Sequence, residues 1–126
     1  MEKQNEQPTL ETFENGTKEW RLNGQLHRED GPAVENVDGL KEWFQNDRLH
    51  RLDGPAREWL NGSKEWWQKG KRHREDGPAI EFADRSKQWW INGKKLSESE
   101  FNQRTKQLPP NQSKEKPLSF FDSLIL

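Results

Sequence analysis

The tetrapeptide Asp-Gly-Pro-Ala stands at residues 30–33, 53–56 and 76–79, so each copy follows the one before it after 23 residues. Other residues keep the same step, namely the histidines His27, His50 and His73 and the tryptophans Trp20, Trp43, Trp66 and Trp89. A fixed period of this length is typical of stacked repeats, in which each unit buries its apolar side against its neighbours. We divide the array into units 16–38, 39–61 and 62–84, with a half unit from 85 to about 96.

Composition and charge restrict the class of protein. The chain has 126 residues with 21 basic and 22 acidic side chains, a balance that argues against a polyanion-binding protein. Few residues are Leu, Ile, Val or Phe, as in disordered chains, but seven Trp and nine Gly placed within the repeats argue for a fold. No segment approaches the ~18 apolar residues of a membrane span, the amino terminus has no apolar signal core, and Cys is absent. We therefore expect a soluble, unsecreted, cytoplasmic protein, in the cytoplasm of the host cell if it is viral.

Turn signals occur twice in each unit. Asn-Gly or Asp-Gly at residues 15–16, 38–39 and 61–62 are typical of two-residue hairpin turns, and a second turn follows each repeated Trp at 23–24, 46–47, 69–70 and 92–93. Stretches of about five residues lie between the turns, which is the length of a short strand. The pattern predicts an all-β fold, a single-layer antiparallel meander of 23-residue hairpin repeats over residues 9–96, after a flexible amino terminus of residues 1–8.

Two-residue turns also predict which residues face each other. The turn after each Trp predicts the pairs Trp20–His27, Trp43–His50, Trp66–His73, Glu19–Arg28, Glu42–Arg51 and Glu65–Arg74. The other turn predicts Trp43 opposite Val34, Trp66 opposite Arg57 and Trp89 opposite Ile80. One face would then carry a ladder of Trp with the three His, Trp59 and Phe82, and the other Phe44, Trp67 and Trp90 with the Glu–Arg pairs.

The motif Glu-Trp-x-x-Asn-Gly-x-x-His at residues 19–27, followed twelve residues later by Gly39, resembles the MORN repeat. The chain departs from the common pattern in three ways: Trp and His are one residue further apart, Arg follows His where Gly is usual, and Asp-Gly-Pro-Ala replaces a glycine-rich second strand. These departures look like the His-Arg-x-Asp-Gly-Pro-Ala variant of phage, giant-virus and bacterial proteins. The resemblance covers roughly residues 9–96 and implies single-layer hairpin meanders that serve chiefly in scaffolding and partner binding, with lipid-headgroup binding or antitoxin roles in some members.

After the array the pattern changes. Ser97 with Glu100 three residues later has the form of a capping box, which predicts a short capping helix within 97–108, ended by the two prolines at 109–110. Residues 109–117 are typical of a mobile linker. Six of the last nine residues, 118–126, are apolar, so this tail is expected to dock either on its own sheet or on a partner.

The repeated His and Asp suggest an acid/base pair or a metal site. Successive units lie two strands apart, roughly 9 to 10 Å, so the three His cannot share one zinc ion, and no Cys, Tyr or phosphate-binding loop completes a catalytic set. We therefore predict no enzymatic activity, no metal and no cofactor. The His are expected to pack on Trp or to hydrogen-bond the next turn, and the repeated Trp to form a hydrophobic spine. The aspartates Asp30, Asp53 and Asp76 are expected to stabilise the turn before Gly-Pro through hydrogen bonds from the side chain to the backbone.

A binding role is indicated where the repeat is broken. Aromatic residues that vary between units, near Arg or Lys, have the composition of interface hot spots. The predicted partner-binding residues are Trp59, Trp67, Phe82, Trp90, Arg57, Arg72, Phe120 and Phe121. The first hypothesis is a module that binds and inhibits or scaffolds another protein, for example a phage inhibitor of a host factor or an antitoxin. The alternative is a Trp ladder that binds carbohydrate or single-stranded nucleic acid, although the small net charge argues against nucleic acid. Membrane binding is not expected, and a homodimer through edge strands or the tail stays open.

Overall fold

The computed structural model describes residues 7–106, where the chain forms fourteen β-strands and one α-helix. The elements are β1 Thr9–Thr12, β2 Lys18–Leu22, β3 Gln25–Leu26, β4 Val34–Glu35, β5 Lys41–Glu42, β6 Phe44–Gln45, β7 Arg48–Leu49, β8 Arg57–Glu58, β9 Lys64–Glu65, β10 Trp67–Gln68, β11 Lys71–Arg72, β12 Ile80–Glu81, β13 Lys87–Ile91, β14 Lys94–Leu96 and α1 Glu98–Lys106. The predicted linker and tail over 109–126, with Phe120 and Phe121, lie outside the described residues.

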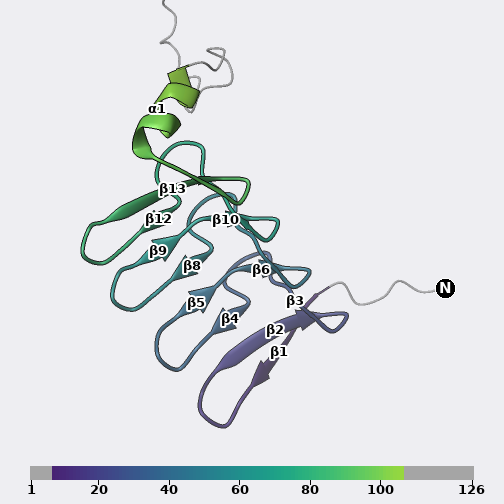
Figure 1. Cartoon of the computed structure of the whole chain (residues 1–126). Coiled ribbons are helices and arrows are strands. Elements are labelled where there is room, and N and C mark those ends of the chain that lie inside the picture. Colours follow the sequence, from purple (N-terminus) through teal and green to yellow (C-terminus); the bar gives the residue numbers. More distant parts are fainter. Residues whose placement is uncertain (1–6, 107–126) are drawn as a thin grey trace, which may run out of the picture.

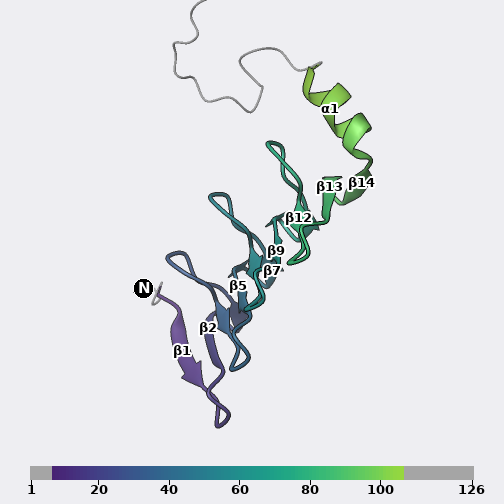
Figure 2. The same ribbon diagram turned by 90° about the vertical axis from the view of Figure 1, so that its left-hand side faces the viewer.

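The strands form an antiparallel meander, so the predicted all-β repeat fold is confirmed (Figure 1). The main sheet has the order β1-β2-β4-β5-β8-β9-β12-β13-β14, with β3 paired to β2, while β6–β7 and β10–β11 are separate two-stranded hairpins. Each repeat contributes one pair of strands to the main sheet and one small hairpin beside it. Figure 2 shows the result as a thin ribbon that steps from β1 at one end to α1 at the other.

The turns after the repeated Trp have the predicted two-residue form. Both turn residues have positive φ in every copy, for example 51° at Asn46 and 66° at Asp47, as a type I′ turn requires. The pairing is the predicted one, with Phe44 opposite Leu49 and Trp67 opposite Arg72. The amide of His50 donates to the carbonyl of Trp43 at 3.0 Å, so this Trp–His pair is confirmed as well.

The predicted register across the other turn is wrong by one residue. The Asn36 amide donates to the Leu40 carbonyl at 2.9 Å, which leaves a loop of three residues, and in that loop only Gly39 has positive φ, at 94°. This is a type I turn followed by a glycine bulge. The Asp38 carboxylate accepts the Leu40 amide at 3.1 Å, an Asx interaction that suits the longer loop.

The longer loop changes which residues face each other. Val34 lies opposite Glu42, Arg57 opposite Glu65 and Ile80 opposite Gln88, where the shorter turn would have placed Trp43, Trp66 and Trp89. Because side chains alternate along a strand, a shift of one residue in the pairing register moves all the side chains that faced one side of the sheet to the other side. Arg57 and Trp59 therefore lie on the face of Trp67, and Phe82 lies on the face of Trp90. The predicted placement of Trp59 and Phe82 beside the repeated Trp is wrong.

One of these three-residue loops has an arginine where the others have glycine. Arg85 adopts a φ of 78°, a left-handed conformation that disfavours residues with a Cβ. We expect Arg85→Gly to raise the free energy of unfolding by about 1 kcal/mol, measured by urea denaturation. Gly62, at φ 97° and with open space where a Cβ would stand, supplies the matched control. Gly62→Arg should lower stability by a similar amount, and unchanged urea midpoints in both variants would contradict the assignment of strain.

The core is small and contains no Trp. Its fully covered members are the alanines of the Asp-Gly-Pro-Ala motif, Ala33, Ala56 and Ala79, each 0% exposed. The Ala56 amide donates to the Glu65 carbonyl at 2.7 Å, and its carbonyl accepts the Trp43 amide at 2.8 Å. Each such alanine thus joins the strands before and after it in the described array, at a point where a larger side chain has no room.

Helix α1 ends the array as predicted. The Ser97 hydroxyl accepts the Glu100 amide at 3.0 Å and the Glu100 carboxylate accepts the Ser97 amide at 2.8 Å, which confirms the capping box. Phe101 is buried, and its ring centroid lies 6.5 Å from that of Trp89. No helix in the described part of the chain has both the length and the apolar character needed to cross a membrane.

Candidate functional site

The sheet has two unlike faces. The face that carries the repeated Trp and the Asp-Gly-Pro-Ala loops is called the motif face. The opposite face, which carries Arg57, Trp59, Trp67, Arg72 and Trp90, is called the ladder face. Their different chemistry decides which one is the candidate binding site.

On the motif face three of the four repeated Trp, all except Trp89, are covered by the arginine eight residues later. The guanidinium carbons of Arg28, Arg51 and Arg74 lie 3.8, 4.0 and 3.8 Å from the ring centroids of Trp20, Trp43 and Trp66. A Cβ at Gly54 would approach the Arg51 guanidinium carbon to 2.8 Å, so the glycine leaves room for the arginine. The motif is thus a sandwich of Trp, Arg and Gly that holds a loop on the sheet.

The arginines bind the loop as well as the ring. Arg51 donates from Nε to Asp53 Oδ1 at 3.0 Å and from Nη1 to the Pro55 carbonyl at 3.0 Å and to Glu58 at 3.3 Å. Arg28 and Arg74 make the equivalent bonds to Asp30 and Asp76. The aspartates thus bind the arginine side chain, where the sequence indicated a backbone amide of the turn.

The predicted pairs Glu19–Arg28, Glu42–Arg51 and Glu65–Arg74 are wrong. The small hairpins end at the Trp–His pair, after which the chain turns away into the Asp-Gly-Pro-Ala loop. Glu42 therefore meets Arg57, whose Nε lies 2.8 Å from Glu42 Oε2. Glu19 instead accepts hydrogen bonds from Arg21, at 2.9 Å from Nη2.

The three histidines connect one unit to the next. Their Nδ1 atoms accept backbone amides of the following turn: His27 from Asn46 at 3.1 Å, His50 from Lys69 at 2.9 Å and His73 from Asn92 at 2.9 Å. With Nδ1 accepting, the proton of a neutral ring is on Nε2, which faces Glu29 at 3.0 Å in the first unit and Glu75 at 3.1 Å in the third. Both ring nitrogens of His27 and His73 therefore hold loops in place.

The contact of His50 predicts a pH dependence of stability. Burial lowers the pKa of His50 below its ordinary value of 6.5, and the positive charge of Lys69 lowers it further. The unfolded chain then binds a proton more readily than the folded one, so this contribution to stability is complete above the ordinary pKa and is lost as the pH falls below it. We expect the urea midpoint to fall between pH 7.5 and pH 5.5.

The control is His50→Asn, because an Asn oxygen can accept the Lys69 amide without titrating. The fall in urea midpoint should be smaller in this variant than in the unmodified chain. An equal fall in both proteins would show that His50 does not cause the pH dependence.

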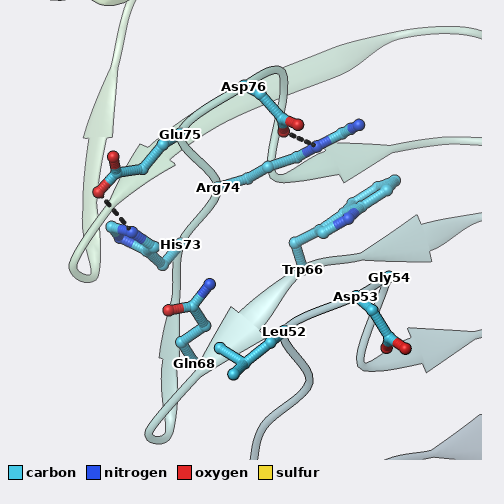
Figure 3. A pocket seen from close by; sticks show the side chains of 9 residues that line it. All are labelled: Leu52, Asp53, Gly54, Trp66, Gln68, His73, Arg74, Glu75 and Asp76. Carbon is cyan, nitrogen blue, oxygen red and sulfur yellow. Dashed lines mark hydrogen bonds and ion pairs between the residues drawn. The ribbon is translucent and has the colours of Figure 1, made fainter. Parts of the chain in front are cut away.

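Open grooves lie between successive loops of the motif face. The one shown in Figure 3 has a volume of about 600 Å³ and is lined by Trp66, His73 and Arg74, with Asp53, Glu75 and Asp76 at its rim. Its described lining residues include no Ser, Thr, Cys or Lys, and no three potential metal ligands gather anywhere in residues 7–106. The groove offers polar side chains that are already engaged in holding the loops.

On the ladder face, tryptophan and arginine alternate across neighbouring units. The Arg57 guanidinium carbon lies 5.8 Å from the Trp59 ring centroid and 5.6 Å from that of Trp67. Arg72 continues the series at 5.0 Å from Trp67 and 4.9 Å from Trp90. The structure therefore brings together five of the eight predicted partner-binding residues, and all five are half-buried.

Phe82 lies beside this group. It is 38% exposed at the end of β12, one repeat after Trp59. The two loops are joined by a hydrogen bond of 3.0 Å from the Ala83 amide to the Ser63 hydroxyl. The remaining predicted residues, Phe120 and Phe121, lie outside the described part of the chain.

Glu65 was predicted on this face, but it was paired with Arg74 and left out of the predicted binding residues. It is 7% exposed, and its Oε1 accepts the Trp67 indole N–H at 2.6 Å and an Arg57 Nη1 hydrogen at 3.5 Å. Its other oxygen lies 3.8 Å from Arg72 Nη2. A correct register across the longer turn would have revealed it, because that register places Glu65 opposite Arg57.

Comparison with known proteins adds no assignment. No family model matches the chain, and neither the curated proteins nor the solved structures contain a match to it. The resemblance to MORN repeats therefore stays a prediction from the repeated residues, and function is argued from the ladder face itself.

Proposed function

We propose that this chain is a non-enzymatic protein-binding module, built of MORN-like repeats, that binds a partner protein through the ladder face and inhibits or scaffolds it. The observation that carries the proposal is the alternation of Trp59, Arg57, Trp67, Arg72 and Trp90 on one face. Trp and Arg are the residues most enriched at the energetic centres of protein interfaces. A rigid sheet presents them in one arrangement, which reduces the entropy lost on binding.

The geometry favours a protein over a sugar or a base. Stacking of a planar ligand requires an indole face that is free. In the ladder, a guanidinium carbon lies 4.9 to 5.8 Å from the centroid of each of the three indoles. Each of these indoles thus has a guanidinium against its ring, and Trp67 has two, so less indole surface is left for a stacked ligand than on an uncovered Trp.

The family resemblance extends the proposal to a biological setting. The His-Arg-x-Asp-Gly-Pro-Ala variant suggests a phage or viral inhibitor of a host factor, or an antitoxin, acting in the cytoplasm. Pairing between two copies is a second mode of association that the fold supports. Strand β1 is the end of the main sheet, and all four of its residues are exposed.

Crosslinking mass spectrometry in lysate of the source organism tests the proposal. We expect crosslinks from the partner to residues near the ladder face, and loss of the partner with the double variant Trp59→Ala/Trp67→Ala. The control is Leu52→Ala, because Leu52 is 74% exposed on the motif face. Equal recovery of the partner by the folded double variant and the control would refute the ladder face as the binding surface.

A further inference from the structure

The guanidinium of Arg72 lacks a full set of acceptors. Its Nε is buried without a hydrogen-bond partner, and its nearest carboxylate oxygen, on Glu65, is 3.8 Å from Nη2. Arg57, in contrast, has a carboxylate at 2.8 Å. An arginine carries five N–H donors. Although Nε itself is buried, the Arg72 side chain is 31% exposed, so the Nη hydrogens beyond the Glu65 contact are available to an oxyanion.

A second cation continues the row one repeat further. Lys95 is exposed and lies directly opposite Trp90, just as Arg72 lies opposite Trp67. Successive repeats are two strands apart, so the two cations are separated by about 9 to 10 Å along the array. At the same position of the preceding unit stands Leu49, so the cationic part of the row is confined to the last two units.

This spacing matches one conformation of a peptide. In a polyproline II helix, residues three apart lie on the same side and about 9 Å apart. Carboxylates at positions i and i+3 of such a segment can meet Arg72 and Lys95 together. An ordinary extended strand presents same-side residues at about 6 to 7 Å, which fits the two cations less well.

The charge of the ladder face favours a short acidic peptide over a nucleic acid. The last units of this face carry three cations, Arg57, Arg72 and Lys95, and the two carboxylates Glu42 and Glu65, which form ion pairs only with the arginines in the described residues. A polyphosphate chain is bound through many Lys and Arg contacts. The two available cations, Arg72 and Lys95, are enough to bind two carboxylates of a peptide but are few for a polyphosphate chain.

We infer that the ladder face binds an acidic segment of the partner protein in the polyproline II conformation, with carboxylates three residues apart received by Arg72 and Lys95. The inference rests on the proposed function and specifies the chemistry of the partner. The indole edges of Trp67 and Trp90 would pack against the residues between the carboxylates.

Isothermal titration of the full chain at low salt with the peptide (Pro-Pro-Glu)₄ tests the inference, with (Pro-Pro-Gln)₄ and a twelve-nucleotide oligothymidine as comparison probes. We expect binding of the Glu peptide and at least about tenfold weaker binding of the Gln peptide, because charge-assisted hydrogen bonds are lost. Arg72→Gln should lower the affinity for the Glu peptide to the same extent. Lys95→Gln changes an exposed site where folding is not at risk, and it should lower the affinity for the Glu peptide about two- to fivefold.

Arg48→Gln is the matched control, because Arg48 is exposed on a hairpin tip outside the ladder and should leave the affinity unchanged. Equal affinity for the Glu and Gln peptides, or no effect of Arg72→Gln and Lys95→Gln, would overturn the inference. Tighter binding of the oligothymidine than of the Glu peptide, reduced by Arg72→Gln, would overturn it in favour of a nucleic acid. If the Glu peptide does not bind, but the Trp59→Ala/Trp67→Ala variant still fails to recover the natural partner, the inference is wrong and the proposed function stands.

Discussion

Replacing Glu65 by alanine is expected to lower the free energy of unfolding by about 3 kcal/mol, because the Trp67 indole N–H loses its acceptor and Arg72, at a partly buried site, loses the only carboxylate that it contacts within residues 7–106. Glu65 is 7% exposed and contacts the Trp67 indole and two guanidinium groups, those of Arg57 and Arg72. Without it, Arg57 keeps Glu42 as its partner, but Arg72 has no carboxylate within 4 Å among the described residues. Equilibrium unfolding in urea, followed by tryptophan fluorescence, measures the effect.

Two further variants make this result specific. Glu58→Ala removes a carboxylate whose side chain is 34% exposed and which pairs with Arg51 on the motif face, so it should cost less than about 1 kcal/mol. Glu65→Gln keeps an acceptor for the indole N–H and loses only the charge, so its stability should lie between those of Glu65→Ala and the unmodified chain. If Glu65→Ala costs no more than Glu58→Ala, Glu65 does not organise the ladder.

The second large effect is expected at Arg51, in the central unit. Arg51→Ala should lower the free energy of unfolding by about 2 to 4 kcal/mol, because charge-assisted hydrogen bonds and a cation–π contact are lost together. The Arg51 guanidinium bonds Asp53 and the Pro55 carbonyl, and it lies 4.0 Å from the Trp43 centroid. The Asp-Gly-Pro-Ala loop would then lose its main attachment to the sheet.

Arg51→Lys and Asp53→Asn separate the components of this effect. Lysine keeps the charge but lacks the planar fork, so most of the loss should remain. Asp53 is 89% exposed on its side chain, so Asp53→Asn should cost less than about 1 kcal/mol. A thermal midpoint for Arg51→Ala within 2 °C of the unmodified chain, where a loss of 1 kcal/mol moves a domain of this size by about 4 to 8 °C, would show that the sandwich is not essential.

Several parts of the fold follow from local sequence. The turns after the repeated Trp are Asn-Gly, Asn-Asp, Lys-Gly and Asn-Gly, and both residues of each adopt positive φ. This two-residue turn determined both the small hairpins and the pairing of Trp43 with His50. Ser97 and Glu100 are three residues apart, so their capping box depends on no other part of the chain. The aromatic residues of the ladder were also recognisable, because they vary where the rest of the repeat does not.

The face on which Arg57 and Trp59 lie could not be obtained in the same way. Asn-Gly fits a two-residue turn and, equally, the last two positions of a three-residue loop. These loops differ by one residue, and one residue exchanges the two faces of a strand. The pairing of Glu65 with Arg57 was therefore missed. The arginines of the motif face were assigned to the wrong glutamates for a different reason, because the small hairpins end at the Trp–His pair.

Local chemistry thus established the repeat, the number of hairpins, the tight turns and the closing helix, because each depends on residues adjacent in the chain. The tertiary structure decided the register of the longer hairpins and, through it, the composition of the ladder face. The reason lies in contacts between units: the Ala56 amide bonds the Glu65 carbonyl of the next unit, and the His50 ring accepts the Lys69 amide of that unit. Those contacts form only when neighbouring units are stacked, so no single 23-residue segment contains the information that selects them.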